Sequence, residues 1–124
     1  MNPDIRSTWA ARLRRPGYVP NKGSLRNSDD GTMCPLGELC ELHRLATGNG
    51  HWSMGRYWCG PGDTAVFGLP RGVIEWAGLT SFVAYPQLGR YNISEWNDGA
   101  EHGTRISFPP AMPEAIAEMI EEYL

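Results

Sequence analysis

The sequence predicts a single α+β domain in which about four helices pack around a small antiparallel sheet. The chain has 124 residues, a usual length for one domain, and residues 1–124 contain no internal repeat and no linker. Four segments space their apolar residues like amphipathic helices. The stretches between them are rich in glycine and aromatic residues, a composition typical of short strands and tight turns.

The first predicted helix begins at Pro3, because proline suits the first helical position and Asn2 can cap the amino end. An apolar residue recurs at every fourth position and defines one buried face, made of Ile5, Trp9 and Leu13. Residues 16–17, Pro-Gly, stop the helix. Residues 17–33 form a loop, and loops of that length tend to be functional or mobile.

The second predicted helix covers residues 34–45, with an apolar band wide enough to be buried on more than one side and a stop at Gly48. Gly37 lowers the stability of this helix by up to about 1 kcal/mol against alanine. A glycine at such a position indicates that another backbone passes close by.

Strands and turns alternate in the middle of the chain. We expect a strand or hairpin near residues 57–59, a turn at 60–63 and an extended run at 64–67. A short helix at 69–79 ends at Gly78, and extended segments follow at 81–85 and 90–96. Residues 97–99, Asn-Asp-Gly, read as a turn, and a last helix runs from about Pro113 to the C-terminus.

Three cysteines, Cys34, Cys40 and Cys59, are an odd number, which favours reduced thiols over a disulfide framework. Their spacing contains no C-x2-C pair, so we expect no metal site and interpret them as buried apolar residues. Cys40 and His43 lie three positions apart on one helix, which leaves half a zinc site geometrically possible.

The basic residues are concentrated at the amino end. Residues 1–26 have a net charge of +5, and the rest of the chain has −8. This asymmetry indicates an anionic partner or an acidic neighbouring subunit.

No apolar run reaches the roughly 18 residues that span a bilayer, and the first residues do not read as a secretion signal. We therefore expect a cytoplasmic protein with no membrane partner.

Several motifs follow one another along the chain in a characteristic order. They are Trp9, Leu13-Arg14, Gly17-Tyr18, Cys34, Leu36-Gly37-Glu38-Leu39-Cys40-Glu41-Leu42, Leu69-Pro70, Val73, Trp76, Gly78-Leu79, Asn97-Asp98-Gly99, Ser107-Phe108 and Ile116-Ala117. In this order they resemble a family of small uncharacterised proteins encoded mainly by bacteriophages. The chain departs from that pattern at Pro35 and in an insertion at residues 109–112.

The resemblance implies an accessory protein that counters bacterial defence in the cytoplasm of the infected host. The leading hypothesis is an oligomer that binds and sequesters a nucleotide immune signal without cleaving it. Two alternatives stay open: an inhibitor that docks on a host protein through the basic N-terminal segment, and a small nucleotide hydrolase. We expect no long nucleic acid as partner.

A nucleotide site needs guanidinium or ammonium groups for phosphate and aromatic faces for the base. The candidate ligand-binding residues are Arg12, Arg14, Arg15, Tyr18, Lys22, Arg26, Trp52, Arg56, Trp58, Asn97 and Asp98. The competing interpretation is that the arginines balance the acidic last helix, that the tryptophans belong to the core, and that residues 97–98 only form a turn.

Nothing in the sequence matches a Walker loop, a dinucleotide fingerprint or a nucleophile elbow. His51 and His102 lie in predicted loops without a defined acid beside them, which is weak support for general base catalysis. We expect no catalytic residues and no cofactor.

Overall fold

The computed structural model describes residues 1–79, 84–99 and 110–124. The helices in these ranges are α1 (Pro3–Leu13), α2 (Pro35–Thr47), α3 (Arg71–Ala77), α4 (Ile93–Asp98) and α5 (Pro113–Tyr123). One antiparallel sheet has the order β1 (His51–Ser53), β2 (Arg56–Gly60), β3 (Asp63–Ala65), and a second pairs β4 (Gln87–Leu88) with β5 (Tyr91–Asn92). The predicted α+β class is confirmed, with one helix, α4, beyond the four expected.

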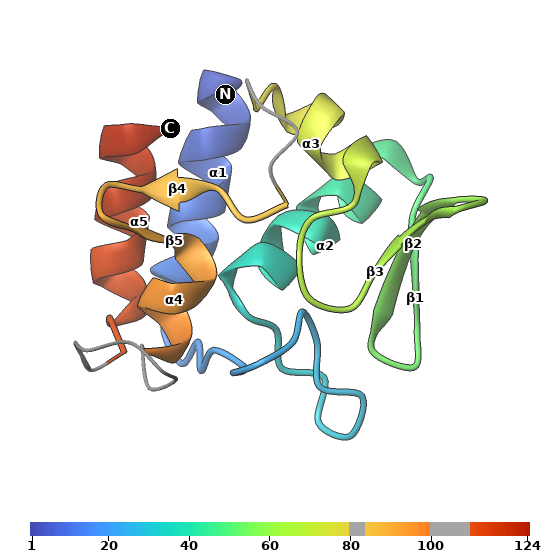
Figure 1. The fold of residues 1–124 in the computed structure, drawn as a ribbon, viewed down its shortest axis with the longest axis horizontal. Coiled ribbons are helices and arrows are strands. Elements are labelled where there is room, and N and C mark those ends of the chain that lie inside the picture. Colours follow the sequence, from blue (N-terminus) through green and yellow to red (C-terminus); the bar gives the residue numbers. More distant parts are fainter. Residues whose placement is uncertain (80–83, 100–109) are drawn as a thin grey trace.

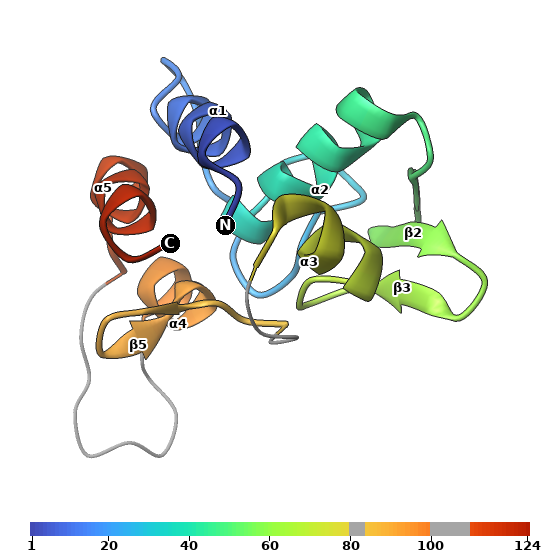
Figure 2. The same cartoon turned by 90° about the horizontal axis from the view of Figure 1, so that it is seen from above.

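Helices α1, α4 and α5 gather at one end of the molecule, the three-stranded sheet lies at the other, and α3 lies beside the sheet (Figure 1). Helices α1 and α5 run side by side in opposite directions, and α2 lies between them and the sheet (Figures 1 and 2). The two ends of the chain meet, since the amino group of Met1 donates to the carbonyl of Leu124 at 3.1 Å.

Helix α1 begins as the sequence predicts. The side chain of Asn2 accepts hydrogen bonds from the backbone N–H groups of Asp4 and Ile5, which would otherwise lack partners. Trp9 is fully buried, and its indole N–H donates to the carbonyl of Pro35 at 2.8 Å. That bond joins the middle of α1 to the start of α2.

Helix α2 is the most deeply buried element, since residues 35–40 are all buried. Cys34 caps its amino end, and Gly48 ends it with a φ of +69° in the left-handed region, as predicted. The predicted close approach at Gly37 is confirmed, because an added Cβ would lie 2.1 Å from the carbonyl oxygen of Leu25. The backbone of the loop 17–33 therefore crosses directly over α2.

The three-stranded sheet is built from two hairpins. Met54 and Gly55, both with positive φ, make the first turn, and Gly62 with a φ of +75° makes the second. The carboxylate of Asp63 then accepts from the backbone N–H groups of Arg71 and Gly72, so a strand residue caps helix α3. Gly78 ends α3 in the left-handed conformation, as predicted.

The prediction of an extended segment followed by a turn at residues 90–99 is wrong beyond β5. Residues 93–98 form α4 because Asn92 and Glu95 make a reciprocal capping box, each side chain accepting from the other's backbone N–H. Residues 97–98 are the last residues of that helix, and Gly99 ends it. The strand predicted at 81–85 falls mostly on residues 80–83, outside the described ranges.

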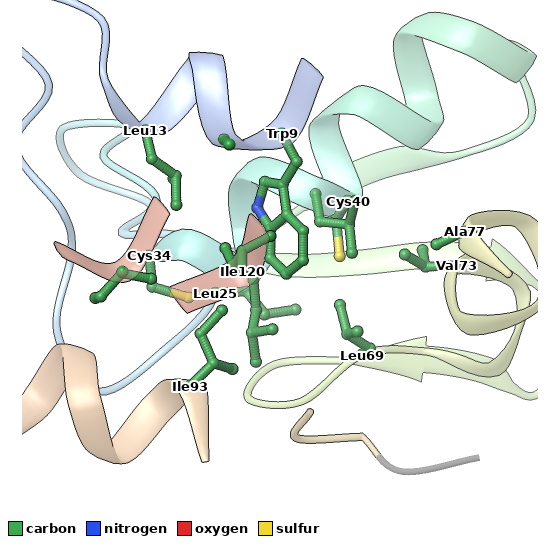
Figure 3. Close-up of a cluster of buried hydrophobic side chains, with 14 of the residues drawn as sticks. Trp9, Leu13, Leu25, Cys34, Cys40, Leu69, Val73, Ala77, Ile93 and Ile120 are labelled. Atoms are coloured by element: carbon green, nitrogen blue, oxygen red, sulfur yellow. The ribbon is translucent and has the colours of Figure 1, made fainter. Parts of the chain in front are cut away.

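The core lies where α1, α2, α3, α4 and α5 converge, with Trp9 at its centre in Figure 3. Cys34 and Cys40 are part of it, which confirms their interpretation as buried apolar residues. Burial raises the pKa of Cys34 to about 11 and that of Cys40 well above its ordinary value. Burial also raises the pKa of the half-buried Cys59 to about 11, so all three thiols stay protonated near neutral pH.

Replacing Gly37 by alanine is expected to lower the free energy of unfolding by about 1–3 kcal/mol, because the new methyl group overlaps a buried carbonyl. The better helix propensity of alanine, about 1 kcal/mol, is too small to offset that overlap. Urea unfolding measures the change. Gly60→Ala is the matched control: it places a methyl group in open space and is expected to change stability by no more than about 0.5 kcal/mol.

Acidification below pH 6.5 is expected to destabilise the fold through His43. The ring is buried, is hydrogen-bonded to the hydroxyl of Tyr57 at 2.6 Å and lies edge-on to Trp76. Burial lowers the pKa of His43 from 6.5, although Asp63 opposes the shift. The unfolded chain therefore takes up a proton at a higher pH than the folded chain, and stability falls as the pH drops from 6.5 toward the folded pKa.

Unfolding in urea at pH 7.5 and pH 5.5 tests this pH dependence. The loss of stability between the two is expected to shrink in His43→Gln and to persist in the control His51→Gln. An equal loss in both variants would assign the pH dependence to other groups.

Candidate functional site

The eleven candidate ligand-binding residues separate into three groups in the folded chain. One group lies at the end of α1 and comprises Arg12, Arg14, Arg15 and Tyr18. A second joins the loop to α4 and comprises Lys22, Asn97 and Asp98. The third belongs to the three-stranded sheet and the loop beneath it, and comprises Arg26, Trp52, Arg56 and Trp58.

At the end of α1, two arginines converge on one buried acid. Arg12 contacts Glu38 at 2.8 and 2.9 Å, and Arg15 contacts it at 2.6 Å. The Glu38 residue is only 1% exposed, so its charge requires partners inside the fold. These two guanidinium groups are therefore largely occupied by an internal anion.

The third arginine of this group, Arg14, pairs with Glu121 of α5. For Arg14 the competing interpretation, an arginine that balances the acidic last helix, is thus confirmed. Next to this group lies a hollow of about 320 Å³, whose wall includes Arg15, Asp30 and Glu38. Two carboxylates in that wall oppose the binding of a phosphate, so the end of α1 is a poor anion site.

Tyr18 helps to hold this hollow together. Its hydroxyl donates to the carbonyl of Met33 at 2.8 Å, and the guanidinium of Arg15 lies 4.5 Å from its ring centroid. Burial, as the main cause, raises the pKa of Tyr18. Its hydroxyl is therefore held within the fold, and one face of its ring lies against a cation of the same chain.

The second group ties the loop to α4. The ammonium of Lys22 donates to the backbone carbonyl of Asn97, and the amide of Asn97 donates to Asn21 and Asp98, both at 2.9 Å. Asp98 also accepts from the backbone of Gly23 at 3.3 Å. Asn97 is 1% exposed, and burial lowers the pKa of Lys22. The amide of Asn97 is therefore occupied by hydrogen bonds within the fold.

The third group contains the residues that remain available. In β2, Arg56 and Trp58 are two positions apart and project from the same face of the sheet. The register places Ser53 beside Arg56 on this face, and His51 and Thr64 beside Trp58. We call these five residues the outer sheet face. Its opposite side packs against the core through Trp52, Tyr57 and Ala65.

The outer sheet face combines a stacked aromatic pair with an unneutralised cation. The rings of His51 and Trp58 are parallel within 3°, with centroids 5.9 Å apart. Arg56 donates to the hydroxyl of Thr64 at 2.8 Å, and no carboxylate of the described residues forms an ion pair with it. The indole N–H of Trp58 is buried and has no hydrogen-bond partner within the described ranges.

Trp52 and Arg26 lie beneath the sheet and not on its outer face. The ring of Trp52 packs on Tyr57 with centroids 4.8 Å apart, and the guanidinium of Arg26 lies 5.7 Å from the Trp52 ring. The structure therefore brings only Arg56 and Trp58 of this group onto one surface. His51, Ser53 and Thr64 are not among the predicted ligand-binding residues, because their position on this face depends on the register of the hairpins.

The structure also describes side chains that could take part in acid–base, thiol or metal chemistry. The buried imidazole of His43 is bonded to Tyr57, and the thiols have raised pKa values. No three side chains of the types His, Cys, Asp and Glu come together as a metal site within the described ranges. The described helices are also too short or too polar for any of them to cross a bilayer.

Comparison with known proteins gives one match. No curated protein and no solved structure is significantly similar to the chain. One family model, Domain of unknown function (DUF8296), matches residues 1–124. Because this match covers all of the sequence, the chain belongs to the DUF8296 family.

Proposed function

We propose that this protein binds a phosphorylated nucleotide on the outer sheet face and retains it without cleaving it. The observation that supports this function most directly is the pairing of Arg56 with Trp58 on one face of β2. Arg56 is a candidate group for a phosphate and Trp58 a candidate group for a base, and the two lie together on this face. No carboxylate of the described residues forms an ion pair with Arg56.

The physical requirements of a nucleotide match what this face offers. A base stacked on an aromatic side chain gains about 1–3 kcal/mol, whatever its identity, because every base has a π-face. A guanidinium donates charge-assisted hydrogen bonds to a phosphate.

The side chains that surround Arg56 and Trp58 support retention of the nucleotide without cleavage. A hydrolase needs a positioned base or nucleophile, and a general base is usually oriented by a third group. His51 is the one imidazole on the face, and its ring contact is a parallel stack on Trp58. That arrangement suits a binding surface.

The size of the face supports the proposal of an oligomer. The flanking strands β1 and β3 have three residues each and extend about 10 Å at roughly 3.3 Å per residue, and the outer sheet face offers one indole ring, that of Trp58, for a base. A cyclic dinucleotide has two bases, so it would need the outer sheet faces of two copies. We therefore propose a homo-oligomer as the form that holds such a signal.

The wider role proposed here is that of a phage-encoded protein which counters bacterial defence in the host cytoplasm. Its support is the order of motifs along the chain, together with a binding surface suited to nucleotides. Docking on a host protein through the basic N-terminal segment is less favoured, because Arg12, Arg14 and Arg15 already pair with acids of the same chain.

Retention by the purified protein tests the proposed function. The protein is incubated with mononucleotides and cyclic oligonucleotides, washed and heat-denatured, and the released material is identified by mass spectrometry. Intact nucleotide is expected. Altered nucleotide would identify a hydrolase, and no retained nucleotide would favour a protein partner.

Variants of the outer sheet face localise the site. Arg56→Gln and Trp58→Leu are each expected to lower the affinity for the retained nucleotide about tenfold or more, since each variant loses one of the contacts described. Calorimetric titration measures this affinity. Arg14→Gln removes the same charge at the surface of α1 and is expected to leave affinity unchanged. If Arg14→Gln weakens binding while Arg56→Gln does not, the site lies at α1. Thermal melting of each variant checks that it is folded.

A further inference from the structure

A second pocket lies away from the outer sheet face, between the start of α2 and the carboxyl end of α4. Its volume is about 130 Å³. Five separate segments converge on it, and the described part of its wall includes Cys34, Leu36, Phe67, Tyr85, Ser94 and Asp98. We call it the α2–α4 pocket.

The body of this pocket is apolar. Leu36 and Ile93 are buried core residues, and Pro35 with Cys34 completes the wall on the side of α2. Burial raises the pKa of the Cys34 thiol to about 11, so it contributes no charge near neutral pH. A cavity of about 150 Å³ with apolar walls is known to accept benzene. This pocket is therefore suited to one ring or one branched alkyl group.

The described part of the wall contains one carboxylate, that of exposed Asp98, and only one of its two oxygens accepts hydrogen bonds from the described residues. Both hydrogen bonds to it, from Gly23 and from the side chain of Asn97, end on Oδ1. No hydrogen bond from the described residues reaches Oδ2. The ammonium of Lys22 acts on Asp98 electrostatically, but its hydrogen bonds go to the carbonyl and side-chain oxygens of Asn97, and Lys22 does not line the pocket.

Two aromatic residues that are unusually exposed line the same pocket. Phe67 is 59% exposed and Tyr85 is 36% exposed. Aromatic rings attract cations through the negative charge of their faces, by about 0.5–1 kcal/mol at exposed sites. An apolar interior, aromatic walls and a carboxylate with a free oxygen together favour a ligand that is apolar at one end and cationic at the other.

We propose that the α2–α4 pocket binds a small organic cation, namely one ring or branched alkyl body that carries a protonated amine. The body enters the apolar space, and the amine donates to Oδ2 of Asp98 beside the rings of Phe67 and Tyr85. This binding site is independent of the nucleotide proposed for the outer sheet face, and its ligand has the opposite charge.

Three compounds of equal size and different charge test the proposal: benzylamine, benzyl alcohol and benzoate. Binding is followed by chemical shifts in two-dimensional NMR of the isotope-labelled protein. Benzylamine is expected to bind about threefold to fivefold more tightly than benzyl alcohol, as for a partly exposed ion pair with aromatic neighbours. Benzoate is expected to bind most weakly. A preference for benzoate, or no saturable shift at residues of the pocket, would overturn the proposal.

Two variants separate the contribution of the Asp98 charge to binding from that of the apolar cavity. Asp98→Asn is expected to remove the preference for benzylamine over benzyl alcohol and to retain the affinity for the alcohol. Lys22→Gln removes the cation next to Asp98, so benzylamine is expected to bind more tightly than in the wild type. If Asp98→Asn keeps the full preference for the amine, the carboxylate is not the recognition group.

A third variant, Ser94→Phe, fills the pocket from α4 and is expected to abolish the binding of all three compounds. The amide spectrum of each variant shows whether it is folded. Trp58→Leu is the control from the other site: it is expected to leave benzylamine binding unchanged, so the two proposals fail or stand separately.

Discussion

The close crossing of the loop backbone over α2 is the constraint on which the arrangement of the other elements depends. Leu25 is fully buried, and its carbonyl accepts from the backbone N–H of Cys34 at 3.0 Å while lying against Gly37. Its own N–H donates to Val66, just beyond β3, at 2.8 Å. One residue thus joins the start of the central helix to the sheet, and a side chain at position 37 would separate them.

This crossing also decides which surfaces are formed. With the loop held over α2, its residues 21–23 lie against the end of α4, where Asn97 and Asp98 bond to them. The same contact closes one side of the α2–α4 pocket. On the other side, the bond to Val66 fixes the strand that carries Thr64 beside Trp58. Both candidate binding surfaces thus depend on an unusually close backbone contact at one glycine.

The charge asymmetry of the sequence has a different meaning in the folded protein than it suggests at first. Glu38 belongs to a helix face that packing buries, and a buried carboxylate needs counter-charges. Arg12 and Arg15 supply them, and Arg14 pairs with α5. Much of the positive segment therefore stabilises the contact of α1 with its neighbours. The cation of the proposed nucleotide site, Arg56, comes instead from strand β2.

The sequence by itself determined the features that depend on neighbouring residues. The cap at Asn2 and the left-handed stops at Gly48 and Gly78 follow from backbone preferences that act within a few residues. Helix α4 belongs to the same category, since its capping box links positions only three apart, but the Asn-Asp-Gly motif that follows is a stronger turn signal. Gly37 indicated that another backbone lies close to α2, but only the tertiary structure shows that this backbone is that of Leu25.

Tertiary structure alone decided which of the candidate residues lie on the outer sheet face. Trp52 and Trp58 both lie in the hairpin of β1 and β2, yet the register of these strands turns one toward the core and the other outward. The burial of Glu38, which takes up two arginines, depends on how α1 packs on α2. The physical reason is that a side chain's partner is set by the summed packing of segments far apart in the chain, whereas caps and turns are set by the chain's own neighbours.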